Sequence, residues 1–252
     1  MSIFDLHGRR ALVVGGGGDL GSAITRALAE AGAAVVAVDI DPQVETLAES
    51  LRAMGRLACG LRVDVRDREA VASSVRTAEA ALDGSIDILV NAAGIQRRHP
   101  SEEFPDNDWD DVLMVNLTAT FLYCRAVAKG MLANGYGKII NIASLMSQFG
   151  GITIPAYAAS KGGVAQLTKA LSNDWAGRGI CVNAIAPGYI DTRLNTALIH
   201  DQRRSAEVLL RTPTNRWGLP ADVAGAAVFL ASSASDFITG VVLPVDGGYS
   251  AR

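Results

Sequence analysis

The sequence predicts an α/β fold: a doubly wound parallel sheet with helices on both of its faces. Short runs rich in β-branched residues alternate with longer segments of helical pattern along the 252 residues. The strand-like runs are apolar on both faces, which is typical of parallel strands covered by helices on both sides. Because strand–helix–strand connections are nearly always right-handed, such a chain gives a doubly wound sheet.

The expected elements follow one another in a regular order. Runs such as RALVVGG, AAVVAVD and CGLRVDV near the start, and GKIINIAS and ICVNAIAP further on, have the composition of strands. The expected strands are 10–16, 33–39, 59–65, 86–94, 137–144, 180–187 and 240–248. The expected helices are 20–31, 44–54, 68–82, about 101–114, about 117–133 and about 156–177.

We expect residues 1–252 to form a single domain, because no linker-like stretch, repeat or low-complexity tract divides them. The least regular segment, at about 189–216, is polar and rich in Arg, Thr and Asn. It lies between the end of a strand and the next helix, where α/β folds carry substrate-binding loops. We predict that this segment is the substrate loop.

The composition excludes several classes of protein. Hydrophobic residues make up 49% and charged residues 19% of the chain, as in a compact globular protein, and the net charge of −3 gives no basic footprint for nucleic acid. Cys59, Cys124 and Cys181 are scattered without metal-ligand spacing, so we expect reduced cysteines and no metal site. We see no signal peptide and no apolar run of roughly 18–20 residues, and expect a cytoplasmic protein without membrane contact.

A glycine-rich loop follows the first expected strand. The segment VVGGGGDLG runs from Val13 to Gly21 and leads into the first expected helix. Glycines at such a turn let the backbone approach the diphosphate of a dinucleotide at a helix N-terminus, as in Rossmann-like folds. The alternative is an ordinary tight turn between a strand and a helix.

Asp39 favours the dinucleotide interpretation. It ends the second expected strand, 18 residues after Gly21, where a carboxylate can hydrogen-bond the hydroxyl groups of the adenosine ribose. The same carboxylate would repel a 2′-phosphate, and Gly18 and Asp19 offer no cation to hold one. We therefore predict NAD rather than NADP, with Asp64 placed to contact the adenine. The alternative for Asp39 is a helix N-cap.

Tyr157 and Lys161 stand four residues apart in YAASK, so they share one face of a helix. Oxidation of an alcohol by hydride transfer requires a base for the hydroxyl proton, but free tyrosine has a pKa of about 10. A cation within ~4–6 Å lowers such a pKa by roughly 1–3 units. We therefore predict that Lys161 acidifies Tyr157, the alternative being two exposed residues on a surface helix.

Several motifs together resemble the short-chain dehydrogenase/reductase family over essentially the whole chain. The family's T-G-x-x-x-G-x-G motif is matched by VGGGGDLG at 14–21, with Val14 and Asp19 departing from it. The motifs NAAG at 91–94, VN at 115–116, NIAS ending at Ser144, YAASK at 157–161 and PGYIDT at 187–192 follow in the family's order. The resemblance implies a Rossmann-like fold and a dehydrogenase that uses a nicotinamide cofactor.

The resemblance also implies roles for individual residues. Tyr157 would be the general base, Ser144 would orient the substrate oxygen, and Lys161 would hold the nicotinamide ribose. Asn116 would keep a proton-relay water in place. Together with the glycine loop and Asp39, the predicted cofactor-binding residues are Gly15, Gly17, Gly18, Asp19, Leu20, Gly21, Asp39, Ile40, Asp64, Val65, Asn91, Ala92, Ala93, Gly94, Tyr157, Lys161, Pro187, Gly188, Ile190 and Thr192.

The segment AGIQRRHP sets Arg97 and Arg98 directly after the fourth expected strand, on the cofactor side. An arginine there can form a bidentate pair with a substrate carboxylate; the alternative is a solvated basic turn or a subunit contact. The full set of predicted substrate-binding residues is Arg97, Arg98, Ser144, Gln148, Tyr157, Tyr189 and Arg193.

Three segments point to a substrate class by resemblance. AGIQRRHP with EFPDNDWDDV resembles the gluconate 5-dehydrogenase branch of the family, and QRRSAEVLLRTPTNRWGLP resembles the 2-dehydro-3-deoxygluconate 5-dehydrogenase branch. Both imply hydride transfer between NAD and a secondary alcohol or ketone of a six-carbon sugar acid. A neutral sugar or sulfosugar dehydrogenase, a 3-oxoacyl thioester reductase and a cofactor-binding regulator without turnover remain alternatives. The resemblance further implies a homotetramer.

Overall fold

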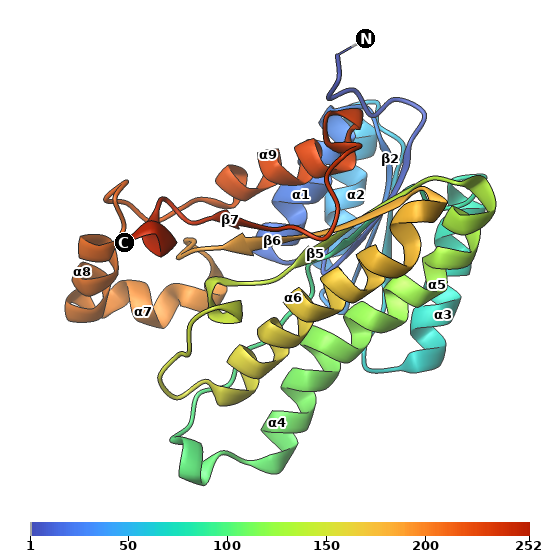
Figure 1. Ribbon diagram of the computed structural model, residues 1–252. Helices are drawn as coiled ribbons and strands as arrows, with labels where there is room; N and C mark the ends of the chain where they lie inside the picture. The colour runs from blue at the N-terminus through green and yellow to red at the C-terminus, as the bar shows by residue number, and fades with distance from the viewer. Residues whose placement is uncertain (1) are drawn as a thin grey trace.

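The computed structural model describes residues 2–252 and contains a seven-stranded parallel sheet (Figure 1). The strand order is β3-β2-β1-β4-β5-β6-β7. Strands β2 and β3 are added on one side of β1, and the direction of addition then reverses, so that β4 to β7 lie on the other side of β1. The strands are β1 Arg10–Val14, β2 Ala34–Asp39, β3 Ala58–Arg62, β4 Ile88–Asn91, β5 Gly137–Ile142, β6 Ile180–Pro187 and β7 Val242–Val245. The predicted doubly wound sheet is confirmed, and its reversal places a crevice at the carboxyl ends of β1 and β4.

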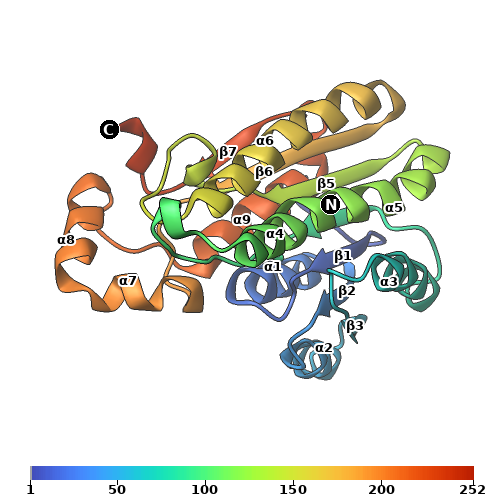
Figure 2. The ribbon, with the colours of Figure 1, turned by 90° about the horizontal axis from the view of Figure 1, so that it is seen from below.

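Helices cover both faces of the sheet (Figures 1 and 2). One face carries α1 Asp19–Glu30, α2 Gln43–Ala53 and α9 Pro220–Ala231, and the other carries α3 Arg68–Ala81, α5 Ala119–Asn134 and α6 Pro155–Trp175. Helix α4, Asp106–Leu113, leads into α5 through a π-helical turn at Met114–Thr118. Two short helices, α7 Thr196–His200 and α8 Gln202–Arg211, project from one end of the molecule.

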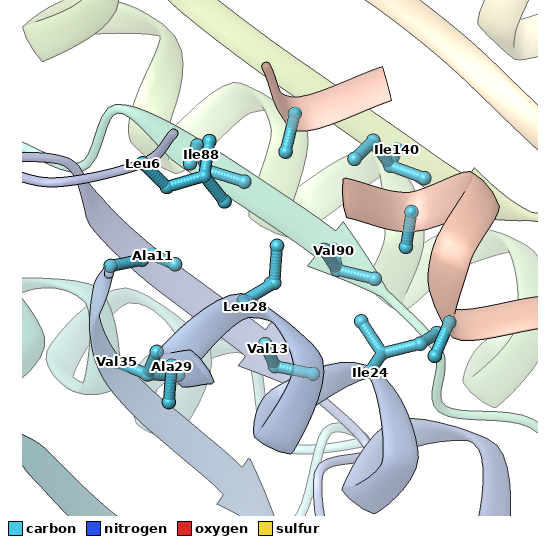
Figure 3. Close-up of a cluster of buried hydrophobic side chains, with 14 of the residues drawn as sticks. Leu6, Ala11, Val13, Ile24, Leu28, Ala29, Val35, Ile88, Val90 and Ile140 are labelled. Carbon is cyan, nitrogen blue, oxygen red and sulfur yellow. The ribbon is translucent and has the colours of Figure 1, made fainter. Parts of the chain in front are cut away.

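Successive side chains along each strand point to opposite faces of the sheet and fill the core on both sides. In β1, Ala11 and Val13 point toward α1 and meet Ile24 and Leu28 there (Figure 3), while Leu12 packs on the opposite face. These side chains are completely buried, and each buried large aliphatic side chain contributes about 1.5–3 kcal/mol to stability. The carboxyl ends of the strands are therefore supported by a fully buried core on both faces of the sheet.

The helical run Asp106–Asn134 is the one membrane-span candidate among residues 2–252, with a mean hydropathy of 1.2. Half of its most apolar window is buried, and the run packs against α3 and α6 within the layer that covers the sheet. Packing in that layer accounts for the apolar composition of the run, and the buried helices of soluble proteins have a similar composition.

The segment at about 189–216 is more regular than the sequence suggested. It contains a 3₁₀ turn at Arg193–Asn195 and the helices α7 and α8. Helix α8 begins after Asp201, whose side chain accepts a hydrogen bond from the backbone N–H of Arg204 at 3.1 Å. Leu198 in α7 and Val208 in α8 are the buried residues of these two short helices, so each helix adds only one side chain to the apolar core.

Candidate active site

Three adjoining hollows lie around the carboxyl ends of the strands. The first, about 380 Å³, is lined by Ser144 and Tyr157 together with parts of the 189–216 segment. The second, about 240 Å³, joins the glycine loop to Tyr157 and Lys161. The third, about 360 Å³, extends from the glycine loop past Asp39 to Asp64. We call them the substrate cleft, the inner hollow and the outer hollow.

Ser144, Tyr157 and Lys161 come together where β5 ends and α6 begins. Helix α6 starts at Pro155, whose fixed φ suits the first helical position, so Tyr157 lies in the first turn and Lys161 in the next. Ser144 follows β5, and its hydroxyl group lies close enough to the Tyr157 phenol to lower the pKa of that phenol. The structure thus brings the three predicted residues together.

Lys161 is not among the groups that lower the pKa of Tyr157, although the sequence predicted that it would be. The Lys161 Nζ donates a hydrogen bond to the backbone carbonyl of Ile142 at 2.7 Å and lies 5.8 Å from the centre of the Tyr157 ring. Burial lowers the pKa of Lys161 to about 8. Burial also raises the pKa of Tyr157, and the Ser144 hydroxyl group and the Arg98 charge offset only part of that rise. Tyr157 is therefore a protonated phenol at neutral pH, able to donate a proton to a carbonyl oxygen.

Asn116 lies in the π-helical turn between α4 and α5, a type of turn that is common at functional sites. Its Oδ1 accepts a hydrogen bond from the Ile95 N–H at 2.8 Å, and its Nδ2 donates to the Ile95 carbonyl and to the Ser160 Oγ, both at 3.0 Å. The side-chain amide thus fastens the loop after β4 to α6. Its contacts are those of a positioning residue, and the contact with a relay water stays a prediction.

The glycine loop is folded so tightly that side chains would not fit. Gly15 has φ of +79°, and a Cβ there would lie 2.4 Å from the Ala93 nitrogen. A Cβ on Gly21 would lie 1.9 Å from the Gly15 carbonyl oxygen. Gly18 borders both the inner and the outer hollow, directly before the N-terminus of α1. This backbone cradle, open to both hollows at a helix N-terminus, fits a dinucleotide diphosphate.

Asp39 ends β2 and borders the outer hollow. Its Oδ2 accepts a hydrogen bond from the Gly17 N–H at 2.9 Å, and its Oδ1 accepts one from the Asp41 N–H at 3.0 Å. Asp64 borders the same hollow and forms a bidentate pair with Arg66, whose guanidinium lowers the pKa of the Asp64 carboxyl. The outer hollow therefore has acidic side chains at the ends of two neighbouring strands, where an adenosine ribose would fit.

Most of the predicted cofactor-binding residues border these hollows. They are Gly15, Gly18, Asp19, Leu20, Gly21, Asp39, Ile40, Asp64, Val65, Ala92, Ala93, Gly94, Tyr157, Lys161, Pro187, Gly188, Ile190 and Thr192. Gly17 contributes through its backbone contact with Asp39. Asn91 lies outside the hollows, because its Nδ2 donates to the Asn141 Oδ1 at 2.9 Å inside the fold.

The predicted substrate-binding residues divide into two groups. Arg98, Ser144, Tyr157 and Tyr189 line the substrate cleft. Arg97, Gln148 and Arg193 are not among its lining residues: Arg97 borders the outer hollow and lies 3.5 Å from an Asp108 carboxylate oxygen, and Arg193 lies against the glycine loop. Successive residues of an extended loop point in different directions, which is why Arg97 and Arg98 separate.

Sequence reasoning missed several residues of the cleft, among them Arg204, Arg211 and Tyr249. Arg204 reaches it from α8 and Tyr249 from the C-terminal turn, where the Tyr249 ring lies 5.1 Å from that of Tyr189. Burial and the neighbouring Tyr249 raise the pKa of Tyr189 to about 12, so Tyr189 stays a neutral phenol. Arg204 stands in QRRSAEVLLR, a segment whose resemblance to sugar-acid enzymes was the available signal.

The comparisons with known proteins agree with this geometry. A short-chain dehydrogenase model described as enoyl-(acyl carrier protein) reductase matches residues 18–250. The 2-dehydro-3-deoxy-D-gluconate 5-dehydrogenase of Escherichia coli (strain K12) is 46% identical over 253 residues, covering 100% of this chain and 99% of the relative. The chain belongs to the short-chain dehydrogenase/reductase family. It is accordingly an oxidoreductase that acts on CH–OH groups with a nicotinamide cofactor.

Two further relatives of this dehydrogenase cover nearly its whole length. The 5-keto-D-gluconate 5-reductase of Escherichia coli (strain K12) is 43% identical and covers 98% of this chain and 97% of its own. The crystal structure of a gluconate 5-dehydrogenase from Burkholderia cenocepacia J2315, in complex with NADP and tartrate, has a TM-score of 0.95 and 47% identity, covering 99% of this chain and 98% of that chain. The fold and the family predicted from the sequence are thus confirmed.

Proposed function

We propose that this dehydrogenase transfers a hydride between NAD and a secondary alcohol or ketone of an open-chain six-carbon sugar acid. The observation that carries the proposal is a pair of arginines in the substrate cleft, Arg98 after β4 and Arg204 on α8. Within residues 2–252, neither guanidinium forms an ion pair with a carboxylate. Arg211 also borders the cleft, but its guanidinium stacks on Tyr249 at 4.3 Å.

The charge balance of the cleft favours an anionic substrate, because three arginines line it against one acidic residue, Glu207. Partial burial and the nearby positive charge of Arg204 lower the pKa of Arg98, so the two guanidinium groups repel each other. A substrate carboxylate relieves that repulsion and can accept bidentate, charge-assisted hydrogen bonds. The Tyr157 phenol is close enough to influence the Arg98 pKa, which brings the proposed carboxylate site near the reacting oxygen. The names of the relatives above support the same substrate class.

The chain's own groups account for the proton. In the reductive direction the protonated Tyr157 donates its proton to the substrate carbonyl oxygen, and Ser144 donates a second hydrogen bond that orients that oxygen. The nicotinamide, when bound, supplies or accepts the hydride. In the oxidative direction Tyr157 takes the proton back, and positive charge near the phenol favours that step.

The preference for NAD is supported by Asp39. Its carboxylate is held by two backbone N–H groups at the end of β2, where a 2′-phosphate would meet a fixed negative charge. The similar structures from Burkholderia cenocepacia, Agrobacterium tumefaciens and Beutenbergia cavernae contain NADP, which favours NADP over NAD, so the two cofactors have to be compared directly in this enzyme. We also propose a cytoplasmic homotetramer, and a stable monomer in light scattering would contradict the assembly.

A substrate panel tests the proposal. Purified enzyme is assayed with gluconate, 2-dehydro-3-deoxygluconate, a neutral hexitol and a 3-hydroxyacyl thioester, each with NAD and with NADP, by the absorbance of the reduced cofactor. We expect turnover with the sugar acids, higher with NAD than with NADP. Turnover restricted to the hexitol or the thioester would overturn the substrate class, and a preference for NADP would overturn the assignment of Asp39.

A further inference from the structure

Arg193 joins the 189–216 segment to the glycine loop through four contacts. Its backbone N–H donates to the Asp19 Oδ2 at 2.6 Å, and its Nε donates to the Asp19 Oδ1 at 3.2 Å. Its Nη1 lies 3.4 Å from the Asp41 Oδ2, and its Nη2 donates to the Gly17 carbonyl at 3.2 Å. A residue predicted to bind substrate is thus held at the opposite side of the site.

The position of Arg193 coincides with the junction of the two cofactor hollows. Among the described residues, it is the one ionisable side chain that borders both the inner and the outer hollow. The other residues shared by the two hollows are Gly15, Gly18, Ala92 and Gly94, which form the bare backbone of the junction. A dinucleotide that occupies both hollows has its diphosphate at this junction, because the diphosphate links its two nucleoside halves.

Asp19 creates an electrostatic problem at that junction. It is the first residue of α1, where a negative charge stabilises the helix but repels an approaching diphosphate. Arg193 compensates for that charge, since both Asp19 carboxylate oxygens are engaged by Arg193. The Nη groups make only the longer contacts of 3.2 and 3.4 Å, which phosphate oxygens can replace.

We propose that Arg193 binds the diphosphate of the cofactor from the side of the 189–216 segment, with Asp19 positioning its guanidinium. The contact makes this segment part of the cofactor site as well as of the substrate cleft. The inference rests on the family's use of a nicotinamide dinucleotide and is independent of the sugar-acid substrate. The chemistry recognised is a phosphate group, whose two sources in these cofactors are the diphosphate and the 2′-phosphate of NADP.

Measured affinities for NADH and NADPH distinguish a contact of Arg193 with the diphosphate from one with the 2′-phosphate. Affinities for NADH and for NADPH are measured by calorimetry on the wild type, on Arg193→Gln and on Arg203→Gln. Arg203 is a matched control, an exposed arginine of the same segment that pairs with Glu207 at 3.2 Å. For Arg193→Gln we expect both affinities to fall by the same factor, roughly 10- to 100-fold, as for loss of a charge-assisted hydrogen bond. The control should bind both cofactors as the wild type does.

Two outcomes would overturn the assignment. A loss confined to NADPH would move the contact to the 2′-phosphate, and unchanged affinities for both cofactors would remove Arg193 from the phosphate site. Thermal unfolding without cofactor shows whether each variant is folded. A variant with Arg193→Lys covers the case in which glutamine disturbs the turn, because lysine keeps the charge and should retain part of the affinity.

A double-mutant cycle tests the role assigned to Asp19. In the Arg193→Gln background the Asp19 carboxylate faces the diphosphate uncompensated, so adding Asp19→Asn should recover several-fold of the lost NADH affinity. In the wild-type background, Asp19→Asn should change the affinity much less. Equal effects of Asp19→Asn in both backgrounds would show that the two residues act independently, and would overturn the positioning role.

Discussion

Replacement of Arg98 by glutamine separates the recognition of a carboxylate from the chemistry of the reaction. The guanidinium of Arg98 lines the substrate cleft and stands near the Tyr157 phenol. A hydrogen bond to a charged partner contributes about 1.5–3 kcal/mol, and solvent access to the cleft reduces this to about 1–2 kcal/mol. That loss corresponds to a fall in kcat/KM of about 5- to 30-fold for a sugar acid.

The assay compares two substrates of similar length in each variant. We expect kcat/KM to fall for the sugar acid but to stay within about twofold for a neutral hexitol. Only the acid has a carboxylate, and only this carboxylate loses its hydrogen bonds to the Arg98 guanidinium. Arg97→Gln is the matched control, since the adjacent arginine lies outside the substrate cleft beside Asp108. Equal losses for the acid and the hexitol, or an equal effect of Arg97→Gln, would refute the carboxylate assignment.

Three further variants test other parts of the site. Tyr157→Phe should keep its affinity for NADH while turnover falls by about 10²- to 10⁴-fold, and near-normal turnover would exclude Tyr157 as the proton-transfer group. Asp39→Ala should raise kcat/KM for NADP relative to NAD, whereas an unchanged ratio would assign the discrimination to another residue. Lys161→Met should raise the thermal unfolding temperature at pH 7, because the depressed pKa of about 8 means that burying the charged amine costs stability. Folded Lys161 holds fewer protons than unfolded Lys161 between pH 8 and about 10.5, so wild-type stability rises across that window and the advantage of the variant should shrink. An increase in unfolding temperature that stays constant with pH would contradict a cost of burying the charged Lys161 amine.

Much of the fold and of the reactive centre follows from local sequence. The glycine loop was predictable because its backbone is closely packed. Any side chain on Gly15 or Gly21 would clash with the loop itself or with the segment that follows β4. Tyr157 and Lys161 were predictable as a pair because helical geometry fixes residues four apart on one face. The strands were predictable because both of their faces are buried, which leaves an unbroken apolar run.

What the sequence did not reveal depends on contacts between distant segments. Arg193 meets Asp19 across 174 positions and Asp41 across 152, and no local pattern pairs an arginine with one of several acidic residues. The direction of the Lys161 amine is set by the carbonyl of Ile142 on β5, which competes with the phenol for it. Arg204 enters the cleft only because α7 and α8 fold across its opening, and no local pattern predicts where two such short helices pack.

The most direct test of the account is a crystal structure of Tyr157→Phe with the reduced cofactor and a bound sugar acid. We predict that the carboxylate accepts hydrogen bonds from the guanidinium groups of Arg98 and Arg204, and that the oxygen on the reacting carbon lies within hydrogen-bond distance of Ser144. A carboxylate bound elsewhere in the cleft, with Arg98 and Arg204 in solvent, would contradict the proposed recognition.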